Sequence, residues 1–108
     1  MCRLVFSPNE IQEFLKGDYF EVYRAEKDHI TVMSKNTKDF WDITIFRNKI
    51  EIGHKHKLHH LYHKDNWSWI ESLKDAKREI VRHDLFVLND RRPIDKDLLK
   101  HILKFYDI

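Results

Sequence analysis

Histidine is concentrated in one short stretch of the chain, and neutral imidazole is among the commonest metal ligands in proteins. Residues 54–64 read HKHKLHHLYHK and hold five of the eight histidines. If the first part is a β-strand, His54 and His56 share a face, because strand side chains alternate. If the later part is a helical turn, His59 and His63 share a face. These four histidines are the candidate metal ligands, and zinc is the candidate ion.

The pattern around the histidines departs from the usual metal motifs. Structural zinc sites usually include cysteine, and the only cysteine, Cys2, is far away in the sequence. Neither an HExxH motif nor a CxxC pair occurs, and Asp65 is the nearest candidate carboxylate. We therefore expect no cofactor, with zinc as the alternative if the histidines converge.

The same stretch also has the pattern of a strand that runs out of the core. The alternation that begins at Ile50 continues through His54 and His56 on one face and places Lys55 and Lys57 on the other. An imidazole can lie at the boundary of the core, because one ring nitrogen can make a hydrogen bond within the protein while the other faces water. We favour this interpretation over the metal site, with the lysines on an outer, solvated face.

Strand patterns precede the histidines. Alternating apolar and polar residues recur in YFEVYRA, ITVMS, FWDITIFRN and KIEIGHKHKL, with short polar turns between them. Such alternation is typical of an antiparallel meander with one buried face. We expect four strands within residues 19–58. Residues 59–67 fit either an extension of the last strand or a crossover to the next helix.

A helix is predicted on the N-terminal side of these strands. Ser7 can cap it, Pro8 suits its first position, and Glu10 completes a capping box. Gly17 ends it, because glycine adopts the left-handed conformation without strain. The predicted helix covers residues 8–16.

Two further helices follow the strands. The first begins at one of two capping boxes, Ser68 with Glu71 or Ser72 with Asp75. The apolar stripe predicted for this helix is Ile70, Leu73, Ala76, Ile80 and Val81. The run LFVLN could add an edge strand, and a final helix begins near Asp95. The order predicts an α+β fold: an N-terminal helix, a four-stranded antiparallel meander, and two C-terminal helices packed on one sheet face, all in a single domain over residues 1–108.

The composition limits the classes of function. Twenty basic and 18 acidic residues give a net charge of +2, which excludes an all-cationic polyanion binder and a strongly acidic DNA mimic. Two glycines leave no loop to cradle phosphates. One cysteine, no apolar run of membrane-spanning length and no signal peptide favour a cytoplasmic protein without a membrane partner.

Cationic and aromatic side chains cluster around the histidines and on the helix that follows. Such side chains stack on bases or fill pockets of protein partners. The residues expected to bind a partner are Lys55, Lys57, Tyr62, Lys64, Trp67, Lys74, Arg78 and Arg82. Lys77 is assigned to the same outward face of the helix, where neighbouring acidic residues could pair with these charges.

The segment from HKHKLHHLYHK through SLKDAKREIVRHD is similar to small proteins of low-GC Gram-positive bacteria and their phages. The resemblance implies no activity, but small phage proteins of this size often bind a host protein, as anti-CRISPR inhibitors do. We therefore expect a non-enzymatic binding protein that acts on a host protein or nucleoprotein complex, for example as a phage or mobile-element inhibitor of a host defence nuclease. The alternatives are a metal-dependent nuclease built on the histidine cluster and a sequence-independent nucleic-acid-binding module.

Overall fold

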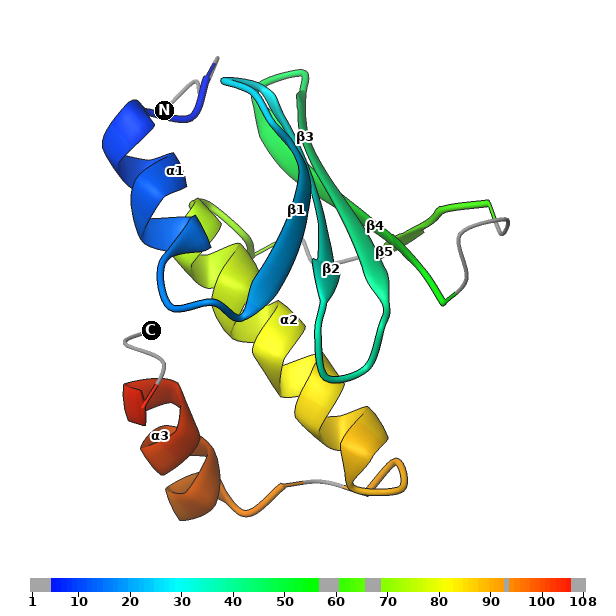
Figure 1. The fold of residues 1–108 in the computed structure, drawn as a ribbon. Coiled ribbons are helices and arrows are strands. Elements are labelled where there is room, and N and C mark those ends of the chain that lie inside the picture. Colours follow the sequence, from blue (N-terminus) through cyan, green and yellow to red (C-terminus); the bar gives the residue numbers. More distant parts are fainter. Residues whose placement is uncertain (1–4, 57–60, 66–68, 93, 106–108) are drawn as a thin grey trace.

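The computed structural model describes residues 5–56, 61–65, 69–92 and 94–105. Its elements run along the chain as a helix, a series of strands and two helices (Figure 1). They are α1 (Pro8–Leu15), β1 (Phe20–Ala25), β2 (His29–Ser34), β3 (Phe40–Phe46), β4 (Lys49–Lys55), β5 (His63–Asp65), α2 (Leu73–Leu88) and α3 (Lys96–Phe105). The predicted α+β fold is confirmed.

The strands form one antiparallel sheet in the order β1-β2-β3-β4-β5. The first four are the predicted meander. Arg47 and Asn48 join β3 to β4 with φ angles of 51° and 66°, as in the two-residue turns that match the twist of a hairpin. β5 adds a three-residue strand that the alternation did not predict, and it pairs His63 with His54.

Local capping signals define α1 as predicted. The Ser7 hydroxyl accepts a hydrogen bond from the Glu10 backbone N–H at 3.1 Å, and Gly17 has a φ of 89° just after the helix. The Glu10 carboxylate also accepts from the backbone N–H of Leu73 at 2.9 Å, at the start of α2. One acidic side chain of α1 therefore caps a helix 63 residues further along the chain.

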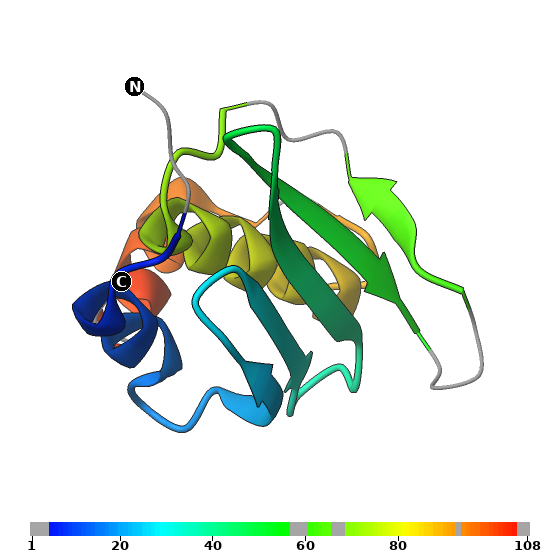
Figure 2. The ribbon, with the colours of Figure 1, turned by 90° about the horizontal axis from the view of Figure 1, so that it is seen from above.

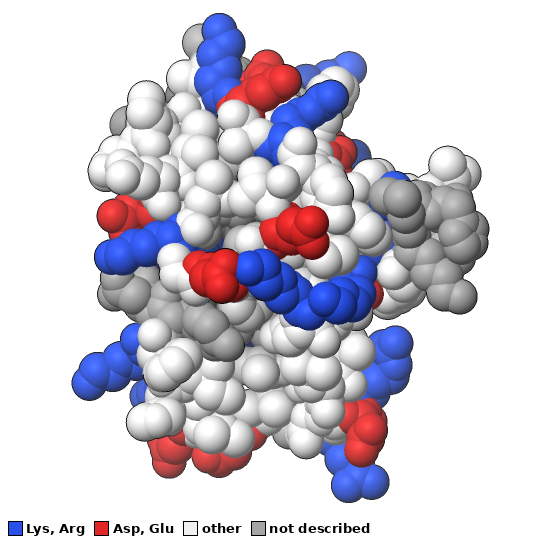
Figure 3. All heavy atoms as spheres, viewed as in Figure 1, with Lys and Arg blue, Asp and Glu red and all other residues white. Residues whose placement is uncertain are grey.

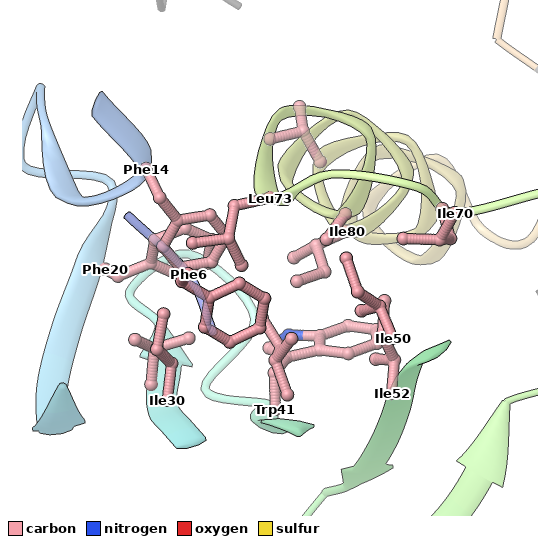
Figure 4. Packing of buried hydrophobic residues seen from close by; sticks show 14 of the residues in the cluster. Phe6, Phe14, Phe20, Ile30, Trp41, Ile50, Ile52, Ile70, Leu73 and Ile80 are labelled. Carbon is pink, nitrogen blue, oxygen red and sulfur yellow. The ribbon is translucent and has the colours of Figure 1, made fainter. Parts of the chain in front are cut away.

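The predicted stripe of α2 forms the centre of the core. In Figure 4, Leu73 and Ile80 point toward Phe6 and Trp41, and the isoleucines of the sheet flank these two rings, Ile30 on one side and Ile50 and Ile52 on the other. All five predicted stripe residues are buried. Of the two capping boxes, the second starts the helix: the Ser72 hydroxyl accepts from the Asp75 N–H at 3.2 Å.

Two predictions on α2 are wrong. The run LFVLN is the last turn of α2 and not an edge strand, because Leu85 continues the apolar stripe against the core. Lys77 does not face outward. It is 3 % exposed and donates a hydrogen bond to the backbone carbonyl of Lys16, at the end of α1, at 2.9 Å.

The helices gather on one side of the sheet (Figures 1 and 2). α2 packs on the sheet, α1 packs against α2 and β1, and α3 joins α2 through Ile102 and Leu103. Asp95 accepts from the Leu98 N–H at 3.2 Å, as its predicted capping role requires. The radius of gyration is 13.4 Å, close to the roughly 13 Å expected for a compact chain of this length.

Charges of both signs are interspersed over the face shown in Figure 3, in keeping with the nearly balanced composition. None of the helices in the described part of the chain is both long and apolar enough to cross a membrane.

Candidate functional site

The strand alternation of β4 divides the histidine and lysine stretch between the two faces of the sheet. His54 points toward α2, where its ring lies 4.9 Å from that of His83. Lys55 therefore points to the opposite face, which we call the open face because none of the described helices covers it (Figure 2). The two neighbouring residues belong to two different candidate sites.

Aromatic rings line the open face around Lys55. The Lys55 ammonium lies 4.2 Å from the ring centroid of Tyr62 and 5.7 Å from that of Phe40. Phe40 in turn contacts Tyr23 at 5.7 Å. We call these four residues the aromatic patch. Tyr23 is 54 % exposed, so the patch ends in a ring that is available to a partner.

A polar network adjoins the aromatic patch on the same face. The Arg24 guanidinium donates a hydrogen bond to Nδ1 of His29 at 2.9 Å. Because a guanidinium can only donate, Nδ1 is the acceptor and the ring hydrogen is on Nε2. Nε2 donates to the Asp42 carboxylate. Asp42 also accepts from the Thr31 hydroxyl at 2.8 Å. Burial raises the pKa of the Tyr62 phenol, and the negative charge of Asp42 raises it further.

The remaining predicted contact residues fall on two separate surfaces. Lys64 is on the open face and pairs with Glu51 at 3.0 Å. Lys74, Arg78 and Arg82 are exposed on α2, on the other side of the sheet. One flat partner surface therefore cannot contact both groups. Lys57 and Trp67 lie outside the described residues.

The structure brings two of the four candidate metal ligands together. His54 is 6 % exposed and stacks on Trp41, and its ring lies 5.2 Å from that of His56. His59 lies outside the described residues, and for His63 only the backbone pairing in β5 is described.

Three residues near these imidazoles come from outside the histidine stretch. Asp39 precedes β3, and its carboxylate is 2.8 Å from Nδ1 of His56. His83 and Asp84 come from α2. For Asp84 the sequence did carry a signal: it stands three residues after Val81 and four after Ile80, on the apolar stripe. Asp39 and His83 had no such signal, because only the fold brings them to His54.

The structure holds Asp84 in place from two sides. Its two oxygens accept from the Tyr19 hydroxyl at 2.6 Å and from the Thr37 hydroxyl at 3.1 Å. Thr37 also accepts from the backbone N–H of Asp39 at 3.3 Å. The segment between β2 and β3 therefore positions both carboxylates.

Comparisons with models of known protein families, with curated proteins and with solved structures found no match.

Proposed function

We propose that the protein is a non-enzymatic binding protein that docks the open face of its sheet onto a protein partner or the protein part of a nucleoprotein complex. The observation that supports this most directly is the aromatic patch on a face that no described helix covers. Tyrosine, phenylalanine and arginine are enriched at the centres of protein interfaces. An inhibitor of a host defence nuclease, carried by a phage or mobile element, is one concrete form of the proposal.

The charges on the open face favour an acidic partner surface. Its exposed or half-exposed cations outnumber its acids. The cations are Arg24, Arg47, Lys49, Lys55 and Lys64, and the acids are Glu21, Glu26, Asp42 and Glu51. Complementary charges around an apolar centre speed association and fix the orientation of the partner.

Paired variants on the two sides of the molecule test this proposal. Lys55→Glu with Tyr62→Ala changes the open face, and Lys74→Glu with Arg78→Glu changes the exposed face of α2. A partner would be captured from host lysate, identified by mass spectrometry, purified, and measured against each variant by calorimetry. We expect roughly a tenfold or greater loss of affinity for the open-face variant and little change for the α2 variant.

The reverse ranking, or equal binding by all variants, would disprove the choice of the open face. Labelled single-stranded DNA, duplex DNA and RNA test the nucleic-acid alternative on the same variants. If these probes bind with an affinity that falls steeply with salt and that depends on Lys55, the partner of the open face is a nucleic acid and not a protein.

A further inference from the structure

A second cluster of polar side chains lies on the opposite side of the sheet, where the start of β3 and the end of β4 face α2. It contains Asp39, His54, His56, His83 and Asp84. They come from the turn before β3, from the end of β4 and from the last half of α2. The cluster does not include any residue of the aromatic patch.

The ligand atoms of the cluster are close together. One atom each from Asp39, His54 and His56 lie within 4.8 Å of one another, and so do one atom each from Asp39, His83 and Asp84. Ligand atoms bound to one zinc ion at about 2.1 Å can be at most about 4.2 Å apart. Each of these two groups is therefore close to the spacing of a coordination sphere, Asp39 belongs to both groups, and half-exposed His56 has room to rotate.

Both carboxylates of the cluster are buried. Asp39 is 3 % exposed and Asp84 is fully buried. Among the described residues, the groups within ion-pair distance are the imidazole of His56 for Asp39 and that of His83 for Asp84, and an imidazole carries charge only when it is protonated. Buried carboxylates need a compensating charge. A bound cation would supply it.

The buried Oδ2 of Asp39 and the buried Nδ1 of His83 make no hydrogen bond to any described residue. Buried polar atoms nearly always have a partner, so such exceptions call for a specific explanation. Nδ1 of His83 is 3.9 Å from Asp84, too far for a hydrogen bond. Both atoms have lone pairs that a metal ion would accept.

We infer that Asp39, His54, His56 and His83 bind one divalent transition-metal ion, with Zn²⁺ as the first choice. Imidazole with carboxylate is a donor set that suits zinc and its neighbours rather than calcium or magnesium. Asp84 lies beside the ion as a supporting charge, because both of its oxygens already accept hydrogen bonds.

Metal titration of the full chain, without a histidine tag and after treatment with a chelator, tests the inference. Elemental analysis after dialysis should find one zinc ion per chain, and calorimetry should show one site. His56→Gln changes a half-exposed ligand with little risk to the fold, and Asp39→Asn keeps the shape of the carboxylate. We expect each to weaken zinc binding roughly tenfold or more. His101→Gln, an exposed histidine of α3, is the matched control.

Tryptophan fluorescence gives a readout at the cluster itself. Trp41 stacks on His54 and meets His83 edge-on, with centroids 4.8 and 5.1 Å away. Co²⁺ bound to these imidazoles should quench Trp41 emission, and the quenching should be lost in Trp41→Phe.

Two results would overturn the inference. One is wild-type protein that binds no stoichiometric Zn²⁺, Co²⁺ or Ni²⁺. The other is stoichiometric binding that His56→Gln and Asp39→Asn leave intact. Loss of that binding in His59→Gln or His60→Gln would then move the site to the later histidines of the stretch.

Discussion

The indole of Trp41 stacks on the imidazole of His54, with ring centroids 4.8 Å apart and planes inclined by only 20°. Trp41 is fully buried and also donates from Nε1 to the Ser34 hydroxyl at 3.0 Å. The two residues face each other across β3 and β4, where they are partners in register. This contact joins the apolar core to the histidine and aspartate cluster.

Replacing Trp41 by alanine should lower the free energy of unfolding by about 3–5 kcal/mol, the usual cost of emptying a large buried site. Urea unfolding followed by circular dichroism measures it. Trp69→Ala is the control, because Trp69 is half exposed, and we expect it to cost about 0.5 kcal/mol. Similar losses for the two variants would contradict the central place of Trp41 in the core.

Tyr19→Phe should destabilise the protein by about 1–3 kcal/mol, because it leaves a buried Asp84 oxygen without its donor. The ring itself stays in place. Tyr23→Phe removes a hydroxyl from an exposed ring and should change stability little. Thermal or urea unfolding of both variants checks this, and equal stability of Tyr19→Phe and the wild type would argue against the hydrogen bond.

Lys77→Met should cost about 1–3 kcal/mol, because it removes the ammonium that donates to the Lys16 carbonyl while preserving most of the side-chain volume. Lys74→Met, on the exposed side of the same helix, is the matched control and should be nearly neutral. Chemical denaturation provides the comparison. A stabilising effect of Lys77→Met would show that burying the ammonium costs more than its hydrogen bond returns.

The raised pKa of Tyr62 predicts a specific loss of stability in alkali. Burial first, and then the charge of Asp42, lift this pKa above the ordinary value of 10.0. The folded protein thus holds the phenolic proton more tightly than the unfolded chain does. This contribution is fully present below pH 10 and is lost as the pH rises through the folded-state pKa.

The unfolding free energy of the wild type should therefore fall more steeply above pH 10 than that of Tyr62→Phe. Denaturation at a series of pH values measures both curves. Parallel curves in that range would show that the folded state does not favour the neutral phenol.

Local signals in the sequence predicted the helices and the first four strands, because capping residues and strand alternation act within a few positions. Signals that depend on neighbours in space were missed. The apolar pattern of α2 did not predict that Lys77 would be buried, since the carbonyl that accepts its hydrogen bond belongs to α1. The strand alternation predicted that His54 and His56 would lie close together, and they do. The carboxylate that the sequence suggested beside them was Asp65, whereas the structure places the Asp39 carboxylate 2.8 Å from His56.

The sequence predicted on which face of the sheet a side chain lies only where the strand register is regular. A bulge between Val22 and Arg24 shifts β1 by one position against β2. Alternation read from Phe20 holds up to the bulge and fails after it. The sequence therefore did not predict that Arg24 would join His29 and Asp42 on the open face.

The hydrogen bond from Leu73 to Glu10 bears on the order in which the chain folds. Each hairpin of the meander closes a short loop, whereas this bond joins residues 63 positions apart. Closing a longer loop costs more chain entropy, so distant contacts form late unless others have already shortened the path between them. Once the hairpins exist, the sheet shortens that path. We therefore expect the junction of α1 and α2 to form after the meander, and a chain released before α2 is complete would have its strands but not the helix that covers them.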